Sequence, residues 1–212
     1  MSILLPELDP RDLDETTEQG NGLRDVLVDG ASWAGGRFEE VEVHSSRLVG
    51  VDLGESVWDG GRVFGSELER VDLSGAEMSG LTFERCLVTG AKFTGARLSH
   101  LTLKDVVFSG CRFDYATLRH MVAAGAVAFV DCVLSSAAWS SCRLPNAVLR
   151  SCKLDGLELD GCHLRGADLR GNDLAGLKAG LGNLQAVTLA PEQLPDLADL
   201  AVTALELTVL AE

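Results

Sequence analysis

The chain has 212 residues, of which 46% are hydrophobic, 24% are charged and 5 are proline. This composition excludes a disordered chain and allows one well-buried core or two small ones. The net charge of −14 argues against direct nucleic-acid binding, because most of the surface repels phosphate. The longest apolar run, residues 121–130, is about half of what a membrane helix needs, and the N-terminus lacks the basic start of a signal peptide. We therefore predict a cytoplasmic protein that does not associate with membranes.

Residues 1–25 form an acidic leader that lacks any repeat. Its apolar residues Ile3, Leu4 and Leu5 either fold over the domain that follows or belong to a frayed tail. The charge is polarised along the chain. Residues 1–84 contain 19 Asp/Glu and 6 Arg (19 − 6, net −13), residues 85–190 contain 8 acidic and 12 basic residues (net +4), and residues 191–212 contain 5 acidic residues and no basic one (net −5). An acidic surface is expected toward the N-terminal end.

A five-residue period follows the leader. Every fifth residue from Val28 to Leu118 is apolar, and so is every fifth residue from Phe129 to Leu174, in a register shifted by one. The position two residues before each of these centres is mostly small or β-branched, and glycine dominates two residues after the centre. Large and small residues spaced by two face the same side of an extended segment, so each unit is predicted to be one side of a coil that ends in a tight corner.

The shift of register predicts one extra residue within residues 119–128. A local bulge is the simplest explanation. The alternative is that the apolar segment from Met121 to Gly125 contacts a partner.

Three units carry a recognisable signature. Residues 71–75 (VDLSG), 162–166 (CHLRG) and 167–171 (ADLRG) resemble the pentapeptide-repeat family. The resemblance covers about residues 26–176 and implies an all-β fold, a right-handed quadrilateral parallel β-helix in which four units make one turn and residue n stacks on residue n+20, about 4.8 Å away. We expect this solenoid over residues 26–178, with Trp33, Trp58 and Trp139 in its core.

Cysteine and histidine are residues of this chain that could bind a transition metal. Stacking places five of the six cysteines in two inward columns, Cys111, Cys132 and Cys152 in one and Cys142 and Cys162 in the other. Side chains of in-register strands run parallel, which suits packing better than a disulfide or a tetrahedral metal site, so free core thiols are expected. His100 and His120 share a corner column that offers no third ligand. No metal and no cofactor are predicted.

No catalytic residue is predicted either. His44 and His163 fall on outer faces, and no glycine-rich phosphate loop precedes a helix. A rod of parallel strands also offers no concave pocket in which reacting groups converge. We therefore predict that the protein is not an enzyme.

Residues 179–212 are expected to cover the open end of the solenoid. Residues 191–201 have prolines at starting positions and indicate a turn followed by a short amphipathic helix, and the alternation of Leu205, Leu207 and Val209 with polar residues indicates a strand. The family resemblance implies a homodimer joined through the C-terminus, and a monomeric cap is the alternative. The expected dimer contacts are Leu194, Leu197, Leu200, Leu205 and Leu207.

Function is inferred from the same resemblance. The quinolone-resistance group of the family consists of dimeric acidic rods that imitate duplex DNA and bind type II topoisomerases, chiefly DNA gyrase, so gyrase or another type II topoisomerase is the expected partner. The acids expected to imitate phosphates are Asp29, Glu39, Asp52, Glu55, Asp59, Glu67, Glu69, Asp72, Glu77 and Glu84.

Two other interpretations remain open. In the first, a row of apolar residues that flank centres on one face, Leu87, Val107, Val130 and Val148, makes the rod a scaffold for another protein. In the second, the acids only keep the rod soluble.

Overall fold

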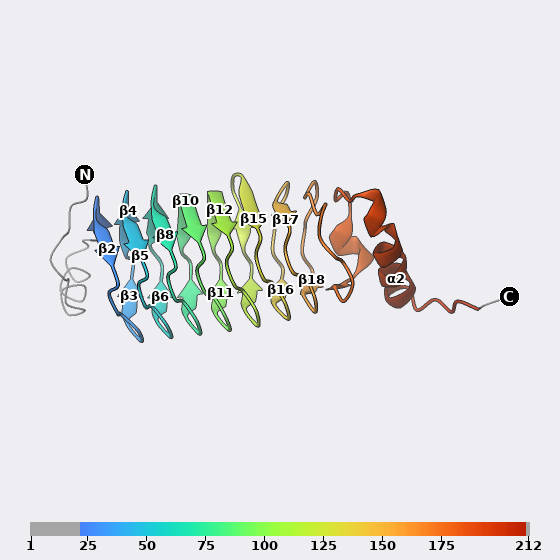
Figure 1. The fold of residues 1–212 in the computed structure, drawn as a ribbon, viewed down its shortest axis with the longest axis horizontal. Coiled ribbons are helices and arrows are strands. Elements are labelled where there is room, and N and C mark those ends of the chain that lie inside the picture. Colours follow the sequence, from blue (N-terminus) through green and yellow to red (C-terminus); the bar gives the residue numbers. More distant parts are fainter. Residues whose placement is uncertain (1–21, 211–212) are drawn as a thin grey trace.

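The computed structural model describes residues 22–210 as a rod of stacked coils with a helix across its C-terminal end (Figure 1). Each coil has four sides, and residues 20 positions apart pair in parallel on neighbouring coils, as Val28 does with Leu48. One side carries an eight-stranded sheet, so the rod has about eight turns. The predicted fold class, a four-sided parallel β-solenoid with a short C-terminal helix, is confirmed. Residues 1–21, most of the predicted leader, lie outside the described residues.

The four sides are numbered here in chain order. Side 1 carries β2 (Leu27–Asp29), β5 (Arg47–Val49), β8 (Glu67–Glu69), β15 (Val127–Val130) and β17 (Val148–Arg150). Side 2 has only single bridges, in a row from Ser32 to Asp173. Side 3 carries β3 (Arg37–Glu39), β6 (Val57–Asp59), β9 (Glu77–Ser79), β11 (Arg97–Ser99), β13 (Thr117–Arg119), β16 (Ala138–Ser140), β18 (Glu158–Asp160) and β19 (Lys178–Ala179). Side 4 carries β1 (Leu23–Arg24), β4 (Glu42–His44), β7 (Arg62–Phe64) and β14 (Val122–Ala123).

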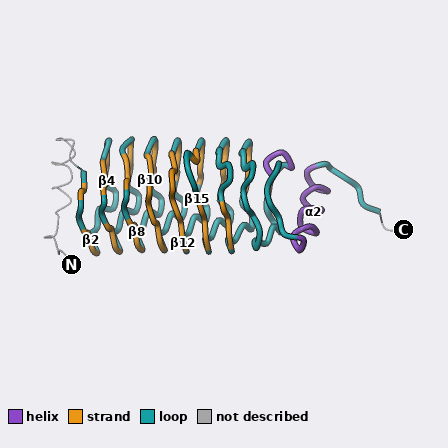
Figure 2. Tube along the Cα trace, turned by 90° about the horizontal axis from the view of Figure 1, so that it is seen from above, coloured by secondary structure: helices purple, strands orange, loops and turns teal. Residues whose placement is uncertain are grey.

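Two longer strands join sides 4 and 1 into one 11-stranded sheet. These are β10 (Thr82–Thr89) and β12 (Thr102–Ser109), which continue through the corner. Seen from above, the coils are parallel rungs and α2 (Leu194–Ala204) lies beyond the last of them (Figure 2).

The unit centres fill the interior. Trp33, Trp58 and Trp139 are only 4%, 7% and 1% exposed, which confirms their predicted place in the core. Phe93 stacks on Phe113 with ring centroids 4.6 Å apart, as expected for residues one coil apart. The apolar period therefore gives one continuous core along the rod.

The corners depend on left-handed backbone. The residue that ends each side has a positive φ, for example 68° at Gly30 and 55° at His100. At Gly61, with φ 98°, a Cβ would lie 2.3 Å from the carbonyl oxygen of Val41, so only glycine fits there. Other corners accept residues such as Asn146 and Ser141, with φ 57° and 54°.

The extra residue lies between β14 and β15. Leu103 pairs with Ala123, 20 positions on, whereas Val106 pairs with Val127, 21 positions on. The side chain of Asp105 accepts a hydrogen bond from the amide of Ala126 at 3.2 Å and holds the bulge in place. The bulge falls inside the range predicted for it.

The six cysteines are buried and unpaired. Their thiols donate to main-chain carbonyl groups, as that of Cys132 does to Phe108 O at 3.5 Å and Val130 O at 3.4 Å. A hydrogen bond with the Cys111 thiol raises the pKa of Cys132 to about 12, and burial raises that of Cys86. The six cysteines are therefore core residues, as predicted, and their thiols also bond to main-chain carbonyl groups. Within residues 22–210, no three or more His, Cys, Asp or Glu side chains are grouped to hold a metal ion.

The C-terminal cap begins with η1 (Leu181–Leu184) and η2 (Pro191–Gln193) and continues as α2. The helix was predicted, and Leu197 and Leu200 pack against the core. None of the helices in the described range is long and apolar enough to cross a membrane.

The predicted strand at residues 205–209 is wrong. Residues 205–210 have no regular structure, and Leu205, Leu207 and Val209 are exposed. The reason is that β19 pairs only with β18, while α2 covers the end of the rod and leaves the tail no strand to pair with.

Candidate functional surface

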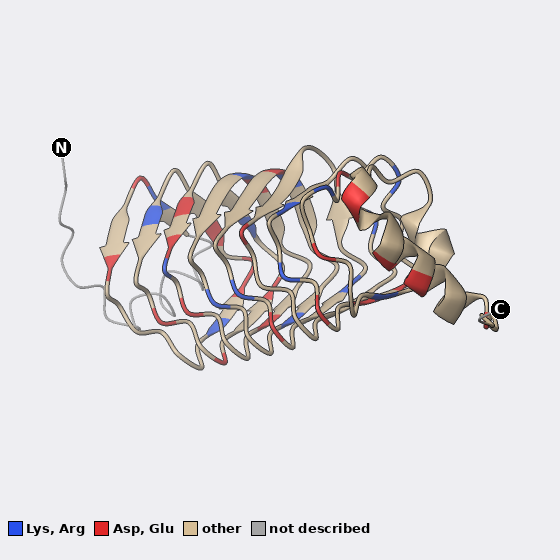
Figure 3. Ribbon diagram, turned by 45° about the vertical axis from the view of Figure 1, so that its right-hand side comes forward, with Lys and Arg blue, Asp and Glu red and all other residues tan. Residues whose placement is uncertain are grey.

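The predicted acids are distributed over all four sides of the rod. Residues immediately before and after each centre point outward, so every coil presents two outer rows per side. Asp29, Glu67 and Glu69 lie on side 1, Asp52 and Asp72 on side 2, Glu39, Asp59 and Glu77 on side 3, Glu84 on side 4, and Glu55 at a corner. Figure 3 shows acidic and basic segments interleaved along the coils. The acids therefore do not form one continuous acidic face.

The structure brings some of these acids into neighbouring positions. Glu39 and Asp59 are in register on β3 and β6, and Asp52 and Asp72 are in register on side 2. Parallel neighbours in register lie about 4.8 Å apart, so each pair places two carboxylates side by side.

Five of the ten predicted acids form ion pairs with a neighbouring coil. Arg47 binds both Glu67 at 3.5 Å and Glu69 at 2.6 Å, and Lys92 binds Asp72 at 3.0 Å. Arg97 binds Glu77, and Glu84 binds both Arg62 and Lys104, the latter at 2.9 Å. From the sequence, these acids were expected to be free charges. Opposite charges 20 residues apart, such as Glu77 and Arg97, are the signal that predicts ion pairs between coils.

The ion pairs change the acidity of three of these carboxyl groups. The Arg47 guanidinium lowers the pKa of Glu69, and Lys104 and Arg62 lower that of Glu84. Burial works to raise the pKa of Asp72, but hydrogen bonds from Ser74 and Lys92 outweigh it and leave the pKa lowered. All three acids are therefore ionised at neutral pH and already matched by a cation.

The unmatched acids lie in the first two coils. Asp29, Glu39, Asp52, Glu55 and Asp59 are exposed, and none lies within 4.0 Å of a basic side chain of residues 22–210. Over residues 22–84 the chain contains 13 Asp/Glu and 5 Arg (13 − 5, net −8). This end of the described solenoid is the strongly negative one.

The apolar row lies on side 1 of the middle coils. Leu87 and Val107 are 42% and 38% exposed and pair on β10 and β12, and Ala128 and Val148 continue the row, half-buried. Val130 is also on side 1, but in the other outer row. The predicted stripe therefore combines two rows of one face.

The apolar side chains at the C-terminal end are more exposed than those of the row on side 1. Leu194, Leu205 and Leu207 are 57%, 57% and 52% exposed, whereas Leu197 and Leu200 pack against the chain's own core. An open and mainly apolar groove lies between α2 and the last coil, where Leu174, Leu177 and Ala179 face Leu200 and Ala204.

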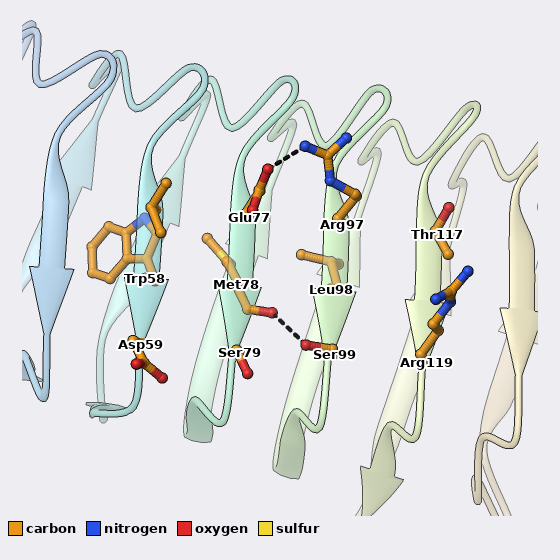
Figure 4. Close-up of a pocket in the computed structure, with 11 residues that line it drawn as sticks. Trp58, Asp59, Glu77, Met78, Ser79, Arg97, Leu98, Ser99, Thr117 and Arg119 are labelled. Atoms are coloured by element: carbon orange, nitrogen blue, oxygen red, sulfur yellow. Dashed lines mark hydrogen bonds and ion pairs between the residues drawn. The ribbon is translucent and has the colours of Figure 1, made fainter.

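A second groove follows side 3 (Figure 4). It is shallow, its floor is the strand backbone over Trp58, Met78 and Leu98, and its walls are the outer rows from Asp59 to Arg119. The Glu77–Arg97 ion pair crosses one wall. No paired acid and base or nucleophile and base that would serve catalysis occurs among its lining residues.

Stacked five-residue units, inward centres and left-handed corners together define a β-solenoid built from pentapeptide repeats. Residues 91–126 and 129–166 match the model of the pentapeptide repeats family, in eight copies. These residues are pentapeptide repeats, and the coils on either side of them continue the same parallel register.

Solved structures of the same fold are known. One trypsin-treated form of QnrB1, described as a plasmid-mediated fluoroquinolone resistance protein, is 18% identical, with a TM-score of 0.58 over 90% of this chain and 99% of that one. A second trypsin-treated form is also 18% identical, with a TM-score of 0.52 over 90% of this chain and 98% of that one. At this identity the likeness shows the fold alone. No curated protein matches the chain.

Proposed function

We propose that the chain is a non-enzymatic DNA mimic that binds a type II topoisomerase, with DNA gyrase as the partner, and that it inhibits the enzyme or protects it from gyrase-targeting drugs. The observation that carries the proposal is the set of unmatched, outward carboxylates on the first two coils. Regularly spaced negative charge on a rigid rod is what a Lys/Arg-lined DNA groove recognises. The fold shared with fluoroquinolone resistance proteins supports the same assignment.

The expected contact lies toward the N-terminal end, and the ion pairs of the following coils support this choice. Carboxylates that already bind an arginine or lysine attract a second cation less, because the first one offsets their charge. Asp29, Glu39 and Asp59 are therefore the principal contacts, and Glu67, Glu69, Asp72 and Glu77 contribute less than a count of acids suggests.

The test is inhibition of gyrase supercoiling by the full-length chain. The triple variant Asp29→Asn, Glu39→Gln and Asp59→Asn is expected to raise the half-inhibitory concentration about tenfold or more, since three contacts to a basic groove lose their charge. These side chains are exposed, so the folded state is expected to change by about 0.5 kcal/mol or less per site. Inhibition by the wild-type protein is expected to weaken as salt is added.

A matched control uses the C-terminal half of the rod. Asp155→Asn, Glu158→Gln and Asp160→Asn change the same residue types and the same net charge in a block that is basic overall. This variant is expected to inhibit nearly as well as the wild type. Equal losses in both variants would show that only net charge matters, and a wild-type protein that neither slows supercoiling nor alters drug-stabilised cleavage at tens of micromolar would refute the proposal.

A scaffold for another protein is the second candidate, favoured by the exposed Leu87 and Val107. The two functions make opposite predictions for Leu87→Ser combined with Val107→Ser. A scaffold is expected to lose its partner, because the exposed apolar contact is removed. A DNA mimic is expected to keep its effect on gyrase, because these residues lie on the middle coils, away from the acids of the first two coils.

We further propose a homodimer joined at the C-terminal end. The exposed Leu205 and Leu207 follow α2, whose residues Leu200 and Ala204 line the apolar groove over the last coil, so apolar residues gather at this end of the rod. Acids on the cap oppose its association with a second copy, since residues 191–212 carry a net charge of −5.

Replacing both Leu205 and Leu207 by glutamate is expected to convert the dimer to a monomer in analytical ultracentrifugation. Salt is expected to tighten the wild-type dimer, because it screens the repulsion between the two acidic caps. Tyr115→Glu, which also places a charge at an exposed position, is the control and leaves the dimer intact. A wild-type protein that is monomeric at high concentration would contradict the model.

A further inference from the structure

A cationic corner separates sides 3 and 4 in the middle of this acidic rod. His100 and His120 occupy the same corner position on successive coils, and their rings stack with centroids 4.9 Å apart and an interplanar angle of 25°. Arg119 immediately precedes His120, and Arg143 and His163 are paired neighbours on side 4, one and two coils further on. All five side chains are exposed. We call this set the histidine corner.

The histidine corner lacks the carboxylates that accompany most other cations of the rod. Three outer rows make up this surface. The row on side 3 contains Ser99, Arg119 and Ser140, and the corner row contains His100, His120 and Ser141. The row on side 4 contains Thr102, Val122 and Arg143. Neither Arg119 nor Arg143 lies within 4.0 Å of a carboxylate of residues 22–210. Figure 4 shows Arg119 one strand beyond the Glu77–Arg97 ion pair, which marks one border, and Asp160, paired with Ser140, marks the other.

Hydroxyl groups line the same surface. Ser140 follows Arg119 in register, Ser141 occupies the corner position after His120, and Thr102 lies on side 4 beside Val122. Guanidinium, imidazole and hydroxyl groups all donate hydrogen bonds, and the planar guanidinium donates two in parallel to phosphoryl oxygens. None of these residues is a Phe, Tyr or Trp, so the phosphate groups of a ligand, and not a base, are the expected points of contact.

We propose that the histidine corner is a binding site for a small phosphate-bearing anion, recognised through its phosphate chain. Arg119 and Arg143 supply the permanent charge, and the stacked imidazoles with Ser140 and Ser141 supply further donors between them. The stacking holds the two imidazoles side by side, so that both can present ring N–H donors to one ligand. A long polyanion such as duplex DNA is excluded by the acids of the first coils and by the net charge of −14.

Calorimetric titration of the full-length chain with tripolyphosphate tests the site. Arg119→Gln combined with Arg143→Gln is expected to weaken binding at least tenfold at low salt. Arg150→Gln combined with Lys153→Gln, on sides 1 and 2, is the matched control, since it removes the same charge from exposed positions. The control is expected to bind within twofold of the wild type. In nitrogen-15 histidine spectra, the signals of His100 and His120 are expected to shift on titration and that of His44 is not.

The proposal would be overturned if millimolar tripolyphosphate gave no heat of binding or if the two double variants lost binding equally. Shifts at His44 as large as those at His100 would also overturn it. ATP is expected to bind within about threefold of tripolyphosphate, and a much tighter ATP would show that a base is recognised, against the proposal. Duplex DNA that displaces tripolyphosphate would also contradict it. The site is independent of the gyrase proposal, because its variants leave Asp29, Glu39 and Asp59 unchanged.

Discussion

Replacing Phe113 by alanine is expected to destabilise the solenoid by about 3–5 kcal/mol, the usual cost of emptying a buried phenylalanine site. Phe113 is 1% exposed and stacks on Phe93 with an interplanar angle of 3°. It also meets Phe108 and Phe129 edge to face at centroid distances of 5.5 and 5.8 Å. Such aromatic pairs add about 0.5–1.5 kcal/mol each beyond the area they bury. Phe93 and Phe113 come from side 2, and Phe108 and Phe129 come from the adjoining side 1.

Thermal unfolding followed by circular dichroism measures this effect. A loss of this size lowers the midpoint of a chain of this length by roughly 6–20 °C. Each coil contacts only its neighbours, so the loss is concentrated in the middle coils, and hydrogen exchange there is expected to accelerate before exchange in the first coils does. Tyr115→Ala is the control, because Tyr115 is 70% exposed only two residues away. If both variants unfold alike, the aromatic cluster is not packed as described.

The regular part of this fold was predictable because one local rule repeats. A large centre, a small residue two positions earlier and a corner two positions later place Phe93 under Phe113 and bury Trp58 without any knowledge of the tertiary structure. The extra residue before β15 was also predictable within a ten-residue window, since the period resumes at Phe129 one position late.

The state of the surface charges was only partly predictable from the same rule, which places opposite charges 20 residues apart, such as Glu77 and Arg97, next to each other. The repeat shows which residues point outward. Whether a carboxylate is unpaired also depends on the side-chain conformation of an arginine or lysine on the neighbouring coil. Glu84 lies between Arg62 and Lys104, whereas Asp59 has Glu39 and Ser79 as its neighbours in register. The histidine corner was not predictable from one row of the repeat, because it combines residues from two sides of the coil.

The C-terminal end was partly predictable. Prolines and acids marked a helix near the observed α2, but the alternation of Leu205 and Leu207 has no strand partner within the chain. Alternation predicts a strand only where another strand edge is available.

The polar end of the cysteine column was not predicted. In side 2, Cys111, Cys132 and Cys152 are followed one coil later by Asn172, which is 5% exposed. The Asn172 amide oxygen accepts a hydrogen bond from Cys152 N at 2.7 Å, and its nitrogen donates to Leu149 O at 2.9 Å and Leu169 O at 2.8 Å. Gln193, directly before α2, donates to Asn172 O at 2.7 Å and to Leu169 O at 2.9 Å. These two amides connect the last coils to the helix that covers them.

Asn172→Ala is expected to destabilise the C-terminal coils by about 3–5 kcal/mol. At least two main-chain groups, Cys152 N and Leu149 O, lose their hydrogen-bond partner while buried, at a cost of about 1–3 kcal/mol each. The missing amide also leaves a small cavity, which adds to the loss. Asn172→Cys separates the cost of the cavity from the cost of the lost hydrogen bonds. It places at residue 172 the same residue type as Cys111, Cys132 and Cys152, and its thiol supplies one donor. Part of the lost stability is therefore expected to be recovered.

Hydrogen exchange measured by mass spectrometry locates the effect of Asn172→Ala. Exchange is expected to be faster in residues 149–204, which include α2, and unchanged in the first four coils. The reason is that each coil of a solenoid is stabilised only by the coils it contacts. Asn183→Ala is the comparison, because Asn183 makes the equivalent bonds to Cys162 N at 3.0 Å and Leu159 O at 2.8 Å but is less buried, so its loss is expected to be smaller. If α2 exchanges in the Asn172→Ala variant as slowly as in the wild type, the helix is held by Leu197 and Leu200 alone.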